Sequence, residues 1–261
     1  MSDCHSRNGF ELHTRNRVTG NNATLTPPPR HHPFTIALVG NPNAGKTTLF
    51  NALTGLRAKT ANFPGTTFER KVGRANIGGC EIAIVDLPGL YSLESAAPEE
   101  KLASDALRGR LENQTAPDAA LVIVDATNLE RNLFLASQVL ELECPVIVAL
   151  NMIDMAAHEG IHIDVKKLRS ELGCVVVPIS ARTGIGLDEL RRKIARLIQA
   201  DGTESDCLAQ RCKPACDRGC GGCPYQARFE WTESVSGKVS NAAVARRSQL
   251  TEKLDKILTH P

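Results

Sequence analysis

The fold is decided by residues 40–47, which read GNPNAGKT. They match the pattern G-x-x-x-x-G-K-[ST] and lie between an apolar run at Phe34–Val39 and a helical pattern at Thr47–Leu53. A strand, a glycine-rich turn and a helix N-terminus form a loop whose backbone N–H groups surround phosphate. We expect Lys46 to bridge the β- and γ-phosphates of a nucleoside triphosphate and the Thr47 hydroxyl to hold Mg²⁺.

Apolar, β-branched runs alternate with amphipathic segments through residues 34–200. This alternation predicts a sheet with crossover helices, and near-continuous apolar runs suit strands covered on both faces. A strand at Lys71–Ile77 is expected to pair with Glu81–Val85 through the Gly78-Gly79 turn, which makes one edge antiparallel. The predicted fold class is α/β, with a mostly parallel six-stranded sheet and helices on both faces. The other strands are expected at Phe34–Val39, Ala119–Val124, Val146–Leu150 and Val175–Ile179, and the helices at Thr47–Leu53, Leu129–Leu142 and Leu187–Ile198.

Two further segments suit a site that senses a γ-phosphate. Residues 86–89 read DLPG at the end of an apolar strand, where Asp86 can reach Mg²⁺ through water and the Gly89 amide can contact the γ-phosphate. Residues 62–67 read NFPGTT, which contains too much Pro and Gly for regular structure. A threonine in this segment, Thr66 or Thr67, can close over Mg²⁺ when the nucleoside triphosphate is bound, so the segment is the candidate first switch.

Base recognition is expected from two short segments after the last two strands. In the sequence NMID at residues 151–154, the Asp154 carboxylate can accept two hydrogen bonds from guanine, whereas adenine would leave it unpaired. Asn151 would brace the loop and contact the base, and Met152 stands where the usual form carries Lys. A backbone N–H of Ser180 or Ala181 can read guanine O6.

In this order and spacing the segments predict a P-loop G domain that binds GTP and GDP. The predicted nucleotide contacts are Asn41, Asn43, Ala44, Gly45, Lys46, Thr47, Thr48, Thr66, Thr67, Gly89, Asn151, Met152, Asp154, Ser180 and Ala181.

The rest of the chain divides by composition. Residues 1–33 are polar and end in a Pro- and His-rich stretch, which predicts a disordered N-terminal tail. Residues 34–200 form the expected G domain. Residues 201–225 are rich in Cys and Gly, and residues 226–261 read as mainly helical.

The wording of the motifs resembles the cytoplasmic G domain of the bacterial ferrous-iron transport protein B family. The resemblance rests on residues 40–51 (GNPNAGKTTLFN), 62–69 (NFPGTTFE), 86–93 (DLPGLYSL) and 151–154 (NMID). Residues 253–261 are similar to the segment before that family's first membrane helix. The resemblance implies a Ras-like G domain whose slow GTP hydrolysis regulates or drives ferrous-iron uptake. It also implies a soluble fragment, truncated before the first transmembrane helix and located at the cytoplasmic face of the inner membrane. The expected partners are the protein's own transmembrane domain, small cytosolic accessory proteins and possible further copies of the chain.

Several residue roles follow from this resemblance alone. Thr67 matches the switch threonine that binds Mg²⁺, and Asn43 matches a position that coordinates an activating K⁺. Leu90 stands where small G proteins carry a water-orienting Gln, so hydrolysis is expected to be slow and to depend on backbone groups and cations. The expected catalytic residues are Lys46, Thr67, Gly89 and Asn43.

Five cysteines fall between residues 207 and 223, with Pro and Gly between them. Closely spaced thiolates in a reducing compartment suit Zn²⁺ or an iron–sulfur cluster, although the spacing matches no standard signature. The alternative is a surface loop with reduced thiols. The candidate ligands are Cys207, Cys212, Cys216, Cys220 and Cys223.

Composition excludes several classes of protein. The 31 basic and 29 acidic residues give a net charge of +2, which goes against nucleic-acid binding through bulk charge. No run of 18 apolar residues and no signal-peptide pattern occur, so a cytosolic setting is expected. A free-standing GTPase of ribosome or tRNA maturation is the alternative, but it would call for a basic extension, and residues 201–261 offer only Arg246-Arg247 as an adjacent pair. A binding-only module is disfavoured by intact Lys46, Thr47, Asp86 and Asp154.

Overall fold

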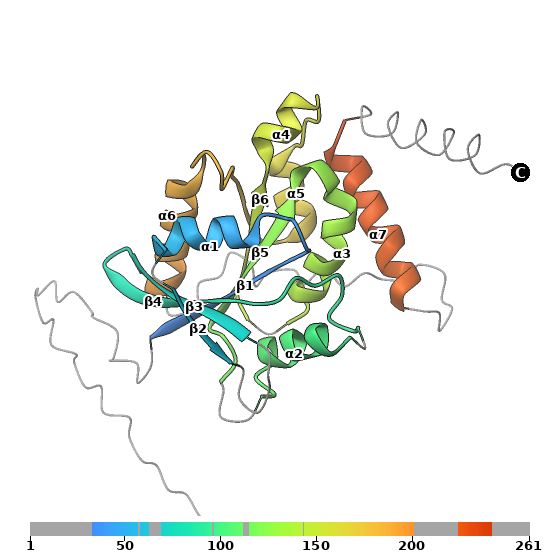
Figure 1. The fold of residues 1–261 in the computed structure, drawn as a ribbon. Coiled ribbons are helices and arrows are strands. Elements are labelled where there is room, and N and C mark those ends of the chain that lie inside the picture. The colour runs from blue at the N-terminus through green and yellow to red at the C-terminus, as the bar shows by residue number, and fades with distance from the viewer. Residues whose placement is uncertain are drawn as a thin grey trace, which may run out of the picture.

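The computed structural model describes residues 33–56, 58–62, 69–95, 97–111, 115–142, 144–200 and 224–241. These residues build a twisted sheet with helices on both faces (Figure 1). The sheet has the strand order β2-β3-β4-β1-β5-β6-β7, in which β2 and β3 are antiparallel to their neighbours and the remaining pairs are parallel. The strands are β1 (Phe34–Gly40), β2 (Ala58–Asn62), β3 (Glu69–Ile77), β4 (Cys80–Asp86), β5 (Ala119–Asp125), β6 (Val146–Asn151) and β7 (Val175–Pro178).

The predicted fold class is confirmed, but the described residues form seven strands of the sheet rather than the six expected. The additional strand is β2, which pairs with β3 and is the last strand in the order of the described sheet. Its sequence AKTAN holds no large apolar side chain, and Ala58, Lys59 and Thr60 are exposed. An exposed edge strand buries little, so it leaves no apolar run in the sequence. The predicted β3–β4 hairpin forms through Gly78-Gly79, where both residues have positive φ.

The helices form two layers, one on each face of the sheet (Figure 1). Apolar residues of α1 and α6 pack on one face, and those of α2, α3, α5 and α7 contribute to the cluster on the other. In α6 the buried residues follow a helical spacing of three and four, which gives a single apolar stripe: Leu187, Leu190, Ile194 and Leu197. The helices are α1 (Lys46–Thr54), α2 (Pro98–Leu107), α3 (Leu129–Leu140), α4 (Ile153–His158), α5 (Val165–Leu172), α6 (Leu187–Gln199) and α7 (Pro224–Val239), with a 3₁₀ turn at Ala126–Asn128.

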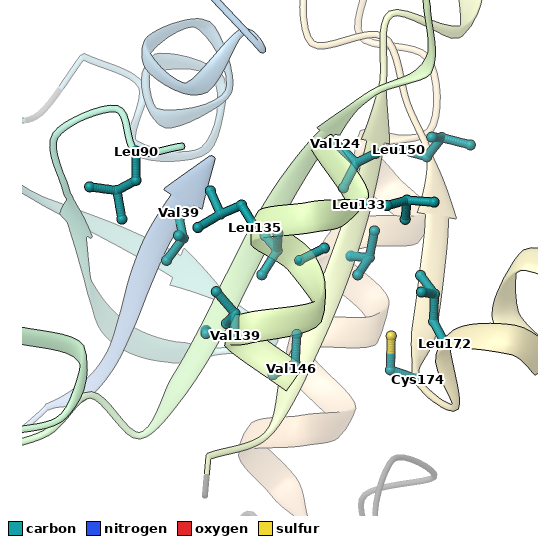
Figure 2. Packing of buried hydrophobic residues seen from close by; sticks show 14 of the residues in the cluster. Val39, Leu90, Val124, Leu133, Leu135, Val139, Val146, Leu150, Leu172 and Cys174 are labelled. Carbon is teal, nitrogen blue, oxygen red and sulfur yellow. The ribbon is translucent and has the colours of Figure 1, made fainter. Parts of the chain in front are cut away.

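The central strands are apolar throughout because both of their faces are covered. In β1, Ile36 and Leu38 pack on the α1–α6 side, whereas Ala37 and Val39 pack on the opposite side. Figure 2 shows this second cluster, in which α3 residues such as Leu135 lie between the sheet and the other helices. The core thus holds the carboxyl ends of the parallel strands in fixed positions.

Helix α7 packs on α3 and α5. Its Arg228 is only 5% exposed and donates to both carboxylate oxygens of Glu141, at 3.0 and 3.1 Å, and to the Ser137 hydroxyl at 3.0 Å. At the other end of the helix, Lys238 pairs with Glu171 of α5 at 3.1 Å. The helix begins two residues before the predicted position and ends at Val239, and residues 242–261 lie outside the described part of the chain.

Candidate functional site

The predicted nucleotide contacts that the structure describes follow β1, β4, β6 and β7. These four strands are parallel, so the segments after them meet at the carboxyl edge of the sheet. In α/β sheets this edge is where ligands bind. The structure therefore brings together four segments that are up to 140 residues apart in the sequence, from Gly40 to Ser180.

The loop between β1 and α1 has the conformation of a phosphate cradle. Asn43 and Gly45 both have positive φ, 67° and 91°, and such backbone turns direct successive N–H groups inward. A Cβ atom on Gly45 would clash with the Asn151 amide nitrogen, so only glycine fits there. The loop begins with Asn41, whose buried side-chain amide has no hydrogen-bond partner among the described residues.

The first turn of α1 places a cation beside a carboxylate. Lys46 Nζ lies 3.8 Å from Asp86 Oδ1, and these side chains are 12% and 9% exposed. Burial lowers the pKa of Lys46, and the negative charge of Asp86 partly offsets the effect. Burial likewise raises the pKa of Asp86, with Lys46 and Lys71 acting in the opposite direction.

The oxygen atoms here suit Mg²⁺, a hard cation that prefers oxygen ligands. Asp86 Oδ1 is buried and accepts no hydrogen bond from the residues that the structure describes, so it is available to a cation or to a water bound by one. The Thr47 and Thr48 side chains are exposed at the first turn of α1. The residues present therefore fit the expected Mg²⁺.

The DLPG turn after β4 lies against the phosphate loop. The Leu90 N–H donates to the Gly40 carbonyl at 3.2 Å, and a Cβ atom on Gly89 would come within 3.1–3.2 Å of Pro42. The Leu90 side chain itself is fully buried and belongs to the hydrophobic cluster drawn in Figure 2. Farther along, the Leu93 N–H donates to the Gln138 side chain of α3 at 2.7 Å.

Asn151 joins the phosphate loop to the segment after β7. Its Nδ2 donates to the Ala44 carbonyl at 2.9 Å, and its Oδ1 accepts from the Ala181 N–H at 2.9 Å. The Asn151 side chain is buried, so both hydrogen bonds are shielded from water. Because the Ala181 N–H is engaged here, it can read guanine O6 only by sharing or exchanging this bond. Ser180 accepts from the Thr183 N–H at 3.3 Å, which closes the turn.

The predicted guanine-reading carboxylate is engaged by a residue that the sequence analysis did not single out. Arg182 Nη2 donates to Asp154 Oδ2 at 2.9 Å. This bond holds the pKa of Asp154 below its ordinary value. Met152, with φ of 62°, forms the left-handed turn that starts α4 and places Asp154 in its first turn.

Some predicted site residues lie outside the described part of the chain. These are the switch threonines Thr66 and Thr67 and the five cysteines of residues 207–223. Within the described ranges, no group of three or more His, Cys, Asp or Glu side chains is arranged to hold a metal ion. No helix in those ranges is long and apolar enough to cross a membrane.

Sequence comparison places this geometry in a known family. The family model described as ferrous iron transport protein B matches residues 34–194. Proteins named Fe(2+) transporter FeoB from Legionella pneumophila (strain Paris) and Salmonella typhimurium are 46% identical over 166 residues and 45% identical over 171 residues. These matches cover 62% and 66% of this chain but 21% and 22% of those relatives, so the chain spans only about a fifth of their length.

Solved structures show the same fold. The cytosolic domain of L. pneumophila FeoB is 31% identical with a TM-score of 0.63, and the match covers 79% of this chain and 99% of that one. The T. maritima cytosolic domain in a GDP form is 29% identical with a TM-score of 0.69, covering 80% and 99%. Because the family match takes in more than half of its residues, the chain belongs to the ferrous iron transport protein B family and carries that family's Ras-like P-loop GTPase domain.

Proposed function

We propose that the chain binds GTP at the carboxyl edge of the sheet and hydrolyses it slowly. The nucleotide cycle would regulate or drive ferrous-iron uptake across the bacterial inner membrane by the longer protein of which this domain is part. The observation that carries the nucleotide site is the Asn151 bridge, which fixes the Lys46 loop and the Ala181 turn next to each other. The transport role is supported by the family to which the chain belongs.

The phosphate end of the site would work through positioning and charge. The Lys46 ammonium would contact the β- and γ-phosphates from the first turn of α1. Thr47 and Asp86 would hold Mg²⁺, with Thr67 closing over it in the GTP-bound state. Mg²⁺ supplies the positive charge that stabilises the phosphates as the bond to the γ-phosphate breaks. The Gly89 N–H would bind the γ-phosphate, and the turn that carries it already lies against Pro42.

Slow hydrolysis is supported by the position of Leu90. Its side chain is fully buried and aliphatic, so it can neither reach nor orient an attacking water. The exposed Asn43 lies in the phosphate loop and would hold K⁺, whose charge would serve in place of an arginine finger. Hydrolysis by the chain should therefore be stimulated by K⁺.

The test is single-turnover hydrolysis of GTP by the purified chain with Mg²⁺, in matched K⁺ and Na⁺ buffers. We expect faster turnover in K⁺, no K⁺ stimulation in Asn43→Ala, and no turnover in Lys46→Ala. The exposed strand variant Asn76→Ala is the matched control and should behave as wild type. Equal hydrolysis rates in the K⁺ and Na⁺ buffers would contradict a role for K⁺. Turnover of ATP as fast as that of GTP would contradict the assignment of the site to guanine nucleotides. Leu90→Ala should alter turnover little once its loss of folding stability is taken into account.

The transport role needs the full-length protein. We propose that the described domain acts at the cytoplasmic face of the inner membrane on the protein's own transmembrane part, with small cytosolic accessory proteins or further copies of the chain as additional partners. Cells whose only ferrous transporter carries Lys46→Ala should lose GTP-dependent uptake of radioactive ferrous iron. Uptake at the wild-type rate would contradict the coupling.

For the cysteine segment we propose a bound Zn²⁺ or iron–sulfur cluster. The support is compositional: five thiols lie within residues 207–223 of a chain expected in a reducing compartment. Elemental analysis of anaerobically purified protein should find near-stoichiometric zinc or iron that is lost when Cys212 and Cys216 are both changed to Ser. Protein without metal and with freely titrating thiols would contradict this proposal.

A further inference from the structure

The Arg182–Asp154 ion pair occupies the carboxylate that is expected to recognise guanine. The two atoms are 2.9 Å apart, and the Asp154 side chain is 20% exposed while that of Arg182 is 76% exposed. The carboxylate is thus partly enclosed, and the guanidinium occupies its Oδ2 atom. Guanine would present two N–H groups to the same carboxylate, so the base and the guanidinium compete for its oxygen atoms.

The backbone that carries Arg182 is fixed. The Gly184 N–H donates to the Ser180 carbonyl at 2.9 Å, and the Ser180 N–H donates to the Ile185 carbonyl at 2.9 Å. A Cβ atom on Gly186 would clash with the Pro178 carbonyl oxygen, so the loop packs closely against the end of β7. The movable part is therefore the long, exposed Arg182 side chain.

Room for that movement exists beside the ion pair. A shallow pocket of about 240 Å³ is lined by Asp154, Met155, His158, Glu159 and Arg182. The guanidinium can turn along this pocket without disturbing a core residue. Its hydrogen bond to the carboxylate also holds the pKa of Asp154 low, so the carboxylate is ionised and ready to accept guanine N–H groups.

We propose that Arg182 sets the nucleotide affinity of this site by competing with guanine for Asp154. In the empty site the guanidinium pairs with the carboxylate, and the incoming base displaces it. This inference rests on the proposed guanine-nucleotide function, because it assigns a second ligand to the same carboxylate. Arg182 acts in the nucleotide-free state, so it lowers the association rate rather than accelerating release.

The test uses fluorescent mant-GDP binding to the purified chain by stopped flow, with Arg182→Gln and Arg182→Lys. An exposed ion pair contributes little, so Arg182→Gln should raise the GDP affinity by about two- to fivefold, through faster association. Arg182→Lys retains the charge and should stay near wild type. The control is Arg74→Met, which removes another exposed pair, Arg74 with Glu81 at 3.1 Å in the β3–β4 hairpin.

A double-mutant cycle tests whether Arg182 acts through Asp154, because a purely structural effect of Arg182 would not depend on the Asp154 carboxylate. Asp154→Asn removes the ion pair and should favour xanthosine diphosphate. In that background Arg182→Gln should have no effect on xanthosine diphosphate affinity, because there is no carboxylate left to compete for. Raised salt should also speed wild-type association relative to Arg182→Gln, since it screens the pair.

Three outcomes would overturn the inference. Unchanged GDP affinity in Arg182→Gln would mean that the pair does not compete. Faster GDP release with weaker affinity would mean that Arg182 holds the bound base instead. An equal effect of Arg182→Gln with and without Asp154→Asn would mean that it acts elsewhere. Failure of folded wild-type protein to bind GDP would instead contradict the proposed function itself, so the two failures are distinguishable.

Discussion

Truncating the Asn151 side chain should lower the free energy of unfolding, because this side chain connects the loops of the nucleotide site. Its side chain makes two buried hydrogen bonds, one to the Ala44 carbonyl and one from the Ala181 N–H, each 2.9 Å long. Asn151→Ala leaves both backbone groups without these partners, and Ala44 and Ala181 are themselves buried. An unsatisfied buried group costs about 1–3 kcal/mol, so the two together predict a loss of roughly 2–6 kcal/mol. That is a large part of the ~5–15 kcal/mol typical of a folded domain.

The measurement is urea unfolding of nucleotide-free protein, because a bound nucleotide would stabilise the folded state and mask the change. The matched control is Asn76→Ala, which removes the same side chain from an exposed position on β3 and should alter the free energy of unfolding by less than about 0.5 kcal/mol. GTP affinity should fall with Asn151→Ala as the two loops separate. A loss of stability equal to that of the control would refute the view that Asn151 connects the loops.

Three further predictions concern single positions. Gly45→Ala should abolish GTP binding in equilibrium dialysis, because a Cβ atom there meets the Asn151 amide; Gly79→Ala, also at positive φ but with nothing within 4 Å, should retain it. Asp154→Asn should lower the affinity for GTP and raise the affinity for xanthosine triphosphate. Equal affinities of the wild-type protein for ATP and GTP would contradict the assignment of Asp154 to guanine recognition. Burial raises the pKa of Cys144 to about 11, so its alkylation by iodoacetamide should be slow at pH 8 and accelerate about tenfold per pH unit below pH 11. Mass spectrometry should find the exposed Cys80 labelled before the partly buried Cys144, and equal labelling of the two would argue against this difference in reactivity.

The strands that sequence predicts best are those buried on both faces. Val146–Asn151 is apolar over five consecutive residues because helices cover both sides of it, and its strand could be placed within one residue. Ala58–Asn62 is a strand only because Glu69–Ile77 pairs with it, and that pairing leaves no trace in its own residues.

Two helices missed by the apolar pattern carried signals of a different kind. Helix α2 begins with Pro98 at its first position and two acidic residues in its first turn, both of which favour a helix N-terminus. In α5 the Asp164 side chain accepts from the backbone N–H groups of Lys166 and Lys167. These N-terminal signals would have located both helices where the hydrophobic period did not.

Sequence motifs could locate the nucleotide-binding segments but not the contacts between them. Asp154 was recognisable because only a carboxylate pairs with two guanine N–H groups. Its partner Arg182 lies 28 residues away on another loop, and the ion pair depends on how β6 and β7 are placed side by side. The bridge from Asn151 to Ala44 crosses 107 residues in the same way.

The end of helix α3, at residues 137–141, hydrogen-bonds to two separate parts of the chain. Gln138 accepts from the Leu93 N–H of the segment that follows Gly89, and the neighbouring Ser137 and nearby Glu141 accept from Arg228 of α7. The segment after Gly89 and the last described helix thus hydrogen-bond to neighbouring residues at the end of α3. A displacement of residues 86–93 would therefore strain or break the hydrogen bond to the buried Gln138. If that bond holds, the displacement would be passed to helix α3 and so to α7, which packs on it.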